Sequence, residues 1–154
     1  MEGTHRPHIL IVSDDLELSQ FLRDGLTIAG FWTSVVASAL QTLELFRLRT
    51  FDIVVIDALL EGLGFEELVQ RLRGAGEDLN QARTDIPVLV IAESEAEVAA
   101  DHARKMGADY VVYAPIEIDD FALRLYGIVR AWREAHPDRP WADSVARKRH
   151  SESQ

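Results

Sequence analysis

Short runs of branched aliphatic residues recur along the chain, and each is followed by a stretch in which apolar residues return every three or four positions. The clearest run, Ile53 to Ile56, has no polar alternation, which is typical of a strand buried on both faces. Similar runs predict further strands at residues 8–12, 31–36, 86–92 and 110–114. Strand-then-helix units in this order predict an α/β fold with a parallel sheet, and right-handed crossovers make it a doubly wound three-layer sandwich.

The predicted helices have recognisable boundaries. The helix after the first strand is expected to stop at Gly30. Ser38-Ala-Leu-Gln41 and Ser94-Glu-Ala-Glu97 both have capping-box spacing, so we expect a helix to begin at each of them. The second of these helices is expected to run to Met106, with Gly107 as its C-cap.

Carboxylates stand directly after two of the predicted strands. Asp57 closes the third strand, and Ser13-Asp14-Asp15 follows the first. In open α/β sheets, ligands bind in the crevice outside the carboxyl ends of the strands, so Asp57 and Asp14 are candidate functional residues. The alternative is that Asp57 only caps the next turn. Asp15 is the better candidate for the N-cap of the following helix.

Composition excludes several functional classes. The chain contains no cysteine, which rules out disulfides, thiolate metal sites and a cysteine nucleophile. Its net charge of −10 argues against general nucleic-acid binding. No apolar run is long enough for a membrane span and the N-terminus has no apolar signal core, so we expect a cytoplasmic protein.

The end of the chain differs from the rest. We expect one domain at residues 1–134 and a tail or linker at residues 135–154, partly disordered. The tail carries two prolines, Trp141 and a basic cluster at residues 147–150. The basic cluster is most simply a solvated terminus, although a docking patch is an alternative. Trp141 is expected to pack against the domain or against a partner.

Residues 7–134 resemble the receiver domain of two-component response regulators, because the order, spacing and predicted strand ends of several motifs agree with that family. The stretches that carry the resemblance are Ile9–Asp15, Phe51–Asp57, Leu60–Phe65, Pro87–Ala92 and Gly107–Pro115. The resemblance implies a flavodoxin-like fold with a five-stranded sheet of order 2-1-3-4-5 and an acidic site at its switch point.

The resemblance also assigns roles to individual residues. Asp57 falls on the phosphoacceptor position of the family, and Asp14 falls on the carboxylate that binds the metal. It implies a Mg²⁺ site formed by Asp14, Asp57 and the backbone carbonyl of Leu59. Two carboxylates hold Mg²⁺ less tightly than three.

The chain departs from the family pattern at five positions. Ser13 stands where a second acid is usual, and Ala92 replaces the Ser or Thr at the end of the fourth strand. Val111 aligns with the switch aromatic, Ala114 replaces the lysine before the proline, and Glu61 stands where proline is usual. We therefore expect an atypical receiver with weakened phosphoryl chemistry.

Two functions are left open by the sequence. The first is a phosphorelay receiver that takes a phosphoryl group from a sensor histidine kinase or a phosphotransfer protein. The second is a phosphorylation-independent interaction module, with a possible homodimer through the face of the fourth helix, fifth strand and fifth helix. We do not expect an enzyme, because the acidic motif after the first strand is not Asp-x-Asp and no glycine-rich phosphate loop is present.

The residues after the last predicted helix are too few for a helix-turn-helix module, so we expect no direct nucleic-acid binding. A stand-alone receiver and a piece of a longer protein both fit the sequence.

Overall fold

The structure is a computed structural model that describes residues 5–75 and 83–142. Its strands are β1 (His8–Val12), β2 (Trp32–Val36), β3 (Ile53–Asp57), β4 (Val88–Ala92) and β5 (Tyr110–Tyr113). Its helices are α1 (Leu16–Ile28), α2 (Ala39–Leu48), α3 (Phe65–Leu72), α4 (Ala100–Met106) and α5 (Ile118–Ala135). The strands form one parallel sheet of order β2-β1-β3-β4-β5, which confirms the predicted topology.

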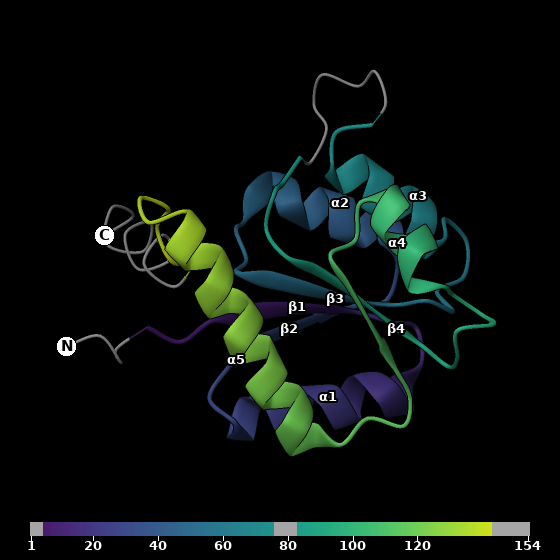
Figure 1. The fold of residues 1–154 in the computed structure, drawn as a ribbon, viewed down its shortest axis with the longest axis horizontal. Coiled ribbons are helices and arrows are strands. Elements are labelled where there is room, and N and C mark those ends of the chain that lie inside the picture. The colour runs from purple at the N-terminus through teal and green to yellow at the C-terminus, as the bar shows by residue number, and fades with distance from the viewer. Residues whose placement is uncertain (1–4, 76–82, 143–154) are drawn as a thin grey trace.

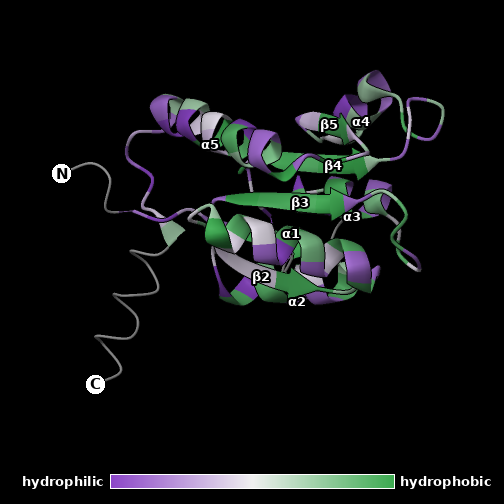
Figure 2. Ribbon diagram, turned by 90° about the horizontal axis from the view of Figure 1, so that it is seen from below, coloured by the Kyte–Doolittle hydropathy of each residue, from purple (hydrophilic) through white to green (hydrophobic). Residues whose placement is uncertain are grey.

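Helices cover both faces of the sheet, which gives the predicted three layers. Helices α1 and α5 lie on one face and α2, α3 and α4 lie on the other (Figure 1). Strands β3 and β4 are buried along their whole length, because they lie inside the sheet and are covered on both faces. Figure 2 shows these strands as hydrophobic arrows between helices of mixed polarity. No helix in the described ranges is both long and apolar enough to cross a membrane.

Most of the predicted helix boundaries are confirmed. The Asp15 carboxylate accepts a hydrogen bond from the amide of Leu18 at 3.2 Å and caps α1. The Ser38 hydroxyl accepts one from the amide of Gln41 at 3.1 Å and caps α2. Gly107 ends α4 with φ of 117°, a left-handed conformation that glycine adopts without strain.

The predicted start of α4 is wrong. The capping-box motif at Ser94 forms only a turn, in which the amides of Glu97 and Val98 donate to the Ser94 carbonyl at 3.1 Å. The helix begins at Ala100 instead. The buried side chain of Val98 anchors this segment in the core, and the Val98 carbonyl accepts a hydrogen bond from the Tyr113 hydroxyl at 2.8 Å. These tertiary contacts override the local helix signal.

The segment after α5 folds back onto the domain. Arg139 binds both carboxylate oxygens of Asp85, at 2.8 and 2.6 Å. The indole N–H of Trp132 donates to the Asp85 carbonyl at 3.1 Å, and the amide of Ala142 donates to Asp52 at 3.2 Å. Trp141 packs against the core cluster between the sheet and α1 and α5, under the guanidinium of Arg133. The basic cluster at residues 147–150 lies outside the described residues.

Two helical glycines differ in their surroundings, and this difference predicts opposite effects of alanine. A Cβ on Gly25 in α1 would lie 2.3 Å from Cγ1 of Ile118, whereas a Cβ on Gly127 in α5 would meet nothing within 4 Å. We expect Gly127→Ala to stabilise the protein by about 0.5–1 kcal/mol through helix propensity. Gly25→Ala should instead destabilise it by about 1 kcal/mol, because overpacking outweighs the same gain. Urea denaturation of both variants measures the contrast, and equal effects would contradict it.

The ion pair between Arg139 and Asp85 predicts a pH-dependent contribution to stability. Its hydrogen bond holds the pKa of the Asp85 carboxyl below its usual value of 3.8. The contribution is therefore present above about pH 4 and is lost as the pH falls through the lowered pKa. Because both side chains are about half exposed and the pair is screened by solvent, we expect Arg139→Gln to lower the stability only slightly at pH 7.

The loss of stability in the same Arg139→Gln variant should be smaller at pH 3 than at pH 7, because the Asp85 carboxyl begins to take up a proton as the pH falls toward its lowered pKa. Urea denaturation at both pH values measures this difference. Arg104→Gln is the control, because it breaks an exposed pair with Asp101 on α4 and leaves the segment after α5 untouched. A loss of stability for Arg139→Gln that is the same at both pH values would refute the electrostatic explanation.

Candidate functional site

The pairing of β1 with β3 brings Ser13 beside Asp57. Val12 is paired with Ile56, so the next residues along the two strands, Ser13 and Asp57, lie side by side at the same edge of the sheet. The Ser13 hydroxyl donates a hydrogen bond to Oδ2 of Asp57 at 2.8 Å. Both side chains are buried, with 3% of Ser13 and 7% of Asp57 exposed. A carboxylate this deeply buried requires such a donor.

The second oxygen of Asp57 is also held. The amide of Leu59 donates to Oδ1 at 3.0 Å, so Asp57 does cap the turn after β3. Capping is not the only contact of Asp57, because Ser13, just after β1, holds its other oxygen. The cap therefore does not exclude a chemical role. The Ser13 oxygen in turn accepts a hydrogen bond from the amide of Asp15 at 3.1 Å. The carboxylate of Asp57 is therefore fixed in one orientation at the carboxyl end of the sheet.

Asp14 lies on the exposed side of the same edge. Its Oδ2 accepts a hydrogen bond from the amide of Glu61 at 3.1 Å, which ties the loop after β3 to the end of β1. Leu59 lies in that loop, with a side chain that is 56% exposed. The predicted metal-binding residues thus occur at the ends of two adjacent strands.

A hollow of about 170 Å³ opens beside Asp57. Ala92 and Ala114, which replace the hydroxyl and the lysine of the family pattern, both line it. Four carboxylates line it too, and no lysine, arginine or histidine among the described residues does so. The acidic side chains are Asp15, Asp57, Glu93 and Glu97. The hollow is therefore a strongly anionic environment.

Val111 does not line this hollow. It pairs with Val90 in the sheet and packs against the core cluster beneath α2, α3 and α4. Tyr113, two residues later, packs against the same cluster and binds the Val98 carbonyl. Tyr113 thus fastens the segment between β4 and α4 to β5.

Two contacts of the site were missed by the sequence reasoning. Ser13 was interpreted only as a missing acid, yet its hydroxyl is the donor that holds Asp57. Strand order 2-1-3 was the available signal, because it places the ends of β1 and β3 next to each other. In the sequence, Glu61 is notable only because it stands where proline is usual, whereas in the structure its backbone amide holds Asp14. Nothing in a residue's identity signals a backbone contact of that kind.

The donor set suits a hard cation. Asp14, Asp57 and the Leu59 carbonyl offer only oxygen atoms, which Mg²⁺ prefers. Within residues 5–75 and 83–142, no group of three or more His, Cys, Asp or Glu side chains is placed so that it could hold a metal ion. Any ion here would rest on two carboxylates, with water and backbone oxygen completing its coordination.

Comparison with known proteins identifies the fold and the family. The family model of the response regulator receiver domain matches residues 9–126. The fold is similar to that of full-length FixJ from B. japonicum, with a TM-score of 0.73 and 24% identity over 87% of this chain and 63% of FixJ. A CheY-like receiver domain from Methanospirillum hungatei has a TM-score of 0.73 and 17% identity, over 85% of this chain and 99% of its own.

Curated relatives agree with this result. The regulatory protein VirG of Agrobacterium tumefaciens is 28% identical over 126 residues, which cover 81% of this chain and 44% of VirG. The response regulator MprA of Mycobacterium ulcerans is 27% identical over 138 residues, which cover 90% of this chain and 56% of MprA. The chain spans about half the length of these relatives. The chain belongs to the response regulator receiver domain family of two-component signal transduction.

Proposed function

We propose that Asp57 accepts a phosphoryl group from a sensor histidine kinase or a phosphotransfer protein. The observation that carries the proposal is the buried Asp57 carboxylate, which Ser13 and the Leu59 amide hold at the carboxyl end of β3. Positioning a nucleophile in this way removes much of the entropic barrier to its attack. The chain would act as the receiver of a phosphorelay.

The transfer exchanges one bond to phosphorus for another. An oxygen of Asp57 forms the new O–P bond while the N–P bond of a phosphohistidine on the donor protein breaks. The electron pair of the broken bond returns to the imidazole nitrogen, which takes up a proton from water. The product is an acyl phosphate on Asp57.

In this proposal, Asp14, Asp57 and the carbonyl of Leu59 would hold Mg²⁺. When bound, Mg²⁺ neutralises charge on the phosphoryl oxygens. Ser13 supports the site differently from an acid, because it supplies a hydrogen bond to Asp57 but no charge for the metal. We therefore propose that Mg²⁺ binds more weakly than at a site with three carboxylates.

We further propose that phosphoryl transfer to Asp57 is slow. Ala114 and Ala92 provide neither a cation nor a hydroxyl to the incoming phosphoryl oxygens, and Glu93 and Glu97 repel them. A charge-assisted hydrogen bond contributes about 1.5–3 kcal/mol, so a missing lysine corresponds to roughly ten- to hundredfold slower transfer.

We also propose the setting in which the chain works. Residues 1–134 would be the receiver and residues 135–154 a tail or linker, in the cytoplasm. A homodimer would use the face of α4, β5 and α5. Leu123, which is 71% exposed on α5, supplies apolar surface for such a contact.

Intact mass spectrometry after incubation with acetyl phosphate and Mg²⁺ tests the phosphoacceptor. We expect one phosphoryl group on the wild type, removable by hydroxylamine because an acyl phosphate is labile to it, and none on Asp57→Asn. Asp24→Asn, an exposed acid on α1, is the matched control and should be labelled like the wild type. An adduct that persists in Asp57→Asn, or none on the wild type at saturating donor, would show that Asp57 is not the acceptor.

A second experiment tests the missing cation. We expect Ala114→Lys to raise the rate of labelling by acetyl phosphate about tenfold or more, because the new ammonium group faces the same hollow as Asp57. Ala114→Met adds similar length without charge and should leave the rate unchanged. Equal rates for the lysine and methionine variants would refute the electrostatic explanation for slow chemistry.

A further inference from the structure

A second hollow, of about 830 Å³, lies at the opposite end of the sheet from Asp57. Its wall includes Phe51 and Asp52 just before β3, Ile86 just before β4, and residues from the ends of α2, α3 and α5. Asp57 closes β3 at its other end, so the full strand, roughly 15 Å, separates the two sites. The volume is typical of cavities that bind small molecules.

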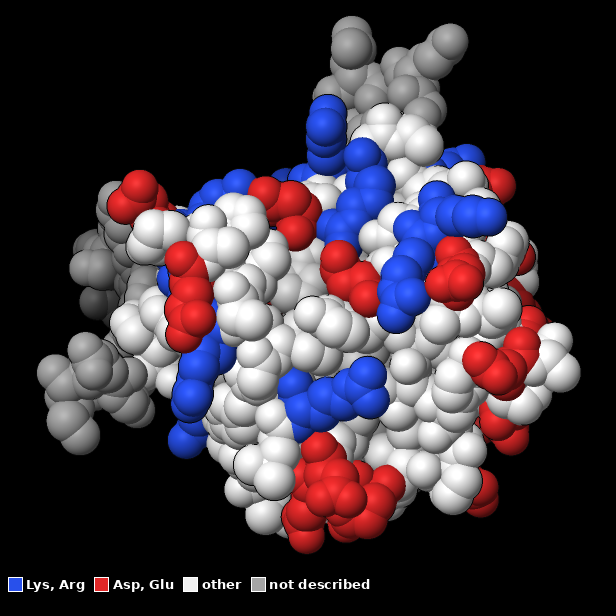
Figure 3. Space-filling view, viewed as in Figure 1, with Lys and Arg blue, Asp and Glu red and all other residues white. Residues whose placement is uncertain are grey.

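Arginines dominate the charged lining of this hollow, although the chain as a whole carries a net charge of −10. The basic residues are Arg49, Arg73, Arg83, Arg133 and Arg139, and the acidic residues are Asp52, Asp85 and Asp109. Figure 3 shows basic side chains gathered on the upper part of the face drawn there, where Figure 1 places α2 and α3.

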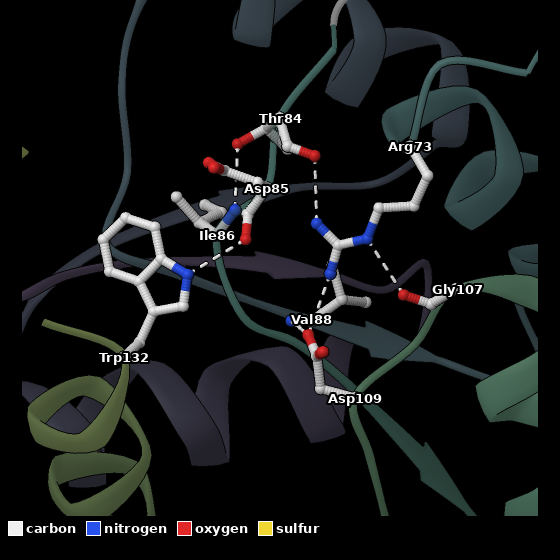
Figure 4. A network of polar contacts seen from close by, with 8 residues as sticks. All are labelled: Arg73, Thr84, Asp85, Ile86, Val88, Gly107, Asp109 and Trp132. Atoms are coloured by element: carbon white, nitrogen blue, oxygen red, sulfur yellow. Dashed lines mark hydrogen bonds and ion pairs between the residues drawn. The ribbon is translucent and has the colours of Figure 1, made fainter. Parts of the chain in front are cut away.

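Each acid of the lining already has partners. Asp85 is bound by both ends of the Arg139 guanidinium. Asp109 accepts hydrogen bonds from Arg73 and from the amide of Val88, both at 2.8 Å (Figure 4). Asp52, which is buried, accepts from the amides of His8 and Ala142 and lies 3.9 Å from Arg133.

Three of the five arginines have structural roles. Arg73 additionally donates to the carbonyls of Gly107 and Thr84, at 2.9 and 3.0 Å, and so joins three segments of the wall (Figure 4). Arg133 and Arg139 hold the segment after α5 against the domain. These contacts fix the shape of the hollow.

Arg49 and Arg83 are different. Both are exposed, and neither makes an ion pair or a side-chain hydrogen bond with any residue in the described part of the chain. Arg49 lies 5.4 Å from the ring centre of Phe51, a cation–π contact that leaves its N–H groups available. With the acids of the wall already engaged, these two guanidinium groups give the hollow an excess of positive charge.

We propose that this arginine-lined hollow binds a small polyanion carrying phosphate groups, with Arg49 and Arg83 as its principal ligands. Guanidinium groups match phosphate oxygens through paired N–H donors, and the fixed Arg73 and Arg139 add positive field. The rings of the wall are engaged, Phe51 with Phe46 and Trp132 with His136, so no base-stacking face is offered. The ligand class is therefore a compact phosphate compound rather than a nucleotide.

Isothermal titration calorimetry with inorganic pyrophosphate, in EDTA and at low ionic strength, tests the proposal. We expect one site on the wild type and at least a tenfold weaker affinity for the double variant Arg49→Gln/Arg83→Gln. Asp57→Asn should bind like the wild type, because the two sites are at opposite ends of β3. This arm separates the inference from the proposed phosphoacceptor.

Controls address charge and folding. Arg47→Gln removes an exposed arginine of α2 that does not line the hollow, and its affinity should be unchanged. Thermal unfolding should change little in the double variant, because both arginines are exposed and the cation–π contact of Arg49 with Phe51 is a weak one. If the double variant unfolds at a clearly lower temperature, the single variants Arg49→Gln and Arg83→Gln replace it. Unmeasurable wild-type binding at millimolar pyrophosphate, an unchanged double variant, or an equal loss in Arg47→Gln would overturn the proposal. Citrate binding as tight as pyrophosphate would overturn the assignment to phosphate.

Discussion

The parallel pairing of β1 with β3 is the constraint on which the functional site depends. It places Ser13 next to Asp57, so that a hydroxyl satisfies a carboxylate that burial alone would make costly. It also sets the end of β1 beside the loop after β3, where the amide of Glu61 reaches Asp14. A shift of one residue in this register would move the branched aliphatic side chains of β3 to the opposite face and separate all these contacts.

The sequence predicted the fold well because its signals are local and repeated. Short β-branched runs such as Ile53–Ile56 favour buried strands, and the caps at Asp15, Ser38 and Gly107 are satisfied within a few residues. The start of α4 failed because the deciding contacts are not local. Tyr113 on β5 and the buried side chain of Val98 fix that segment before the helix begins.

The site was only partly predictable for the same reason. Strand ends and family spacing located Asp14 and Asp57, but the donors that hold them are the hydroxyl of Ser13, just after β1, and backbone amides of a loop. The arginine-lined hollow gave no sequence signal at all. Its arginines come from the ends of α2, α3 and α5 and from two irregular segments, and only tertiary structure brings them together.

Strand β3 carries one carboxylate before its first residue and another at its last, and their surroundings give them different chemistry. Asp52 lies close to Arg133 and accepts hydrogen bonds from two backbone amides, so its charge stabilises the fold. Asp57 has its hydrogen bonds satisfied, yet its hollow contains three further carboxylates and no cation among the described residues. Its orientation is therefore set by the fold. In the proposed function, the positive charge needed for attack on a phosphoryl group would come from a bound ion or from a partner, and the reactivity of Asp57 would be controlled from outside the domain.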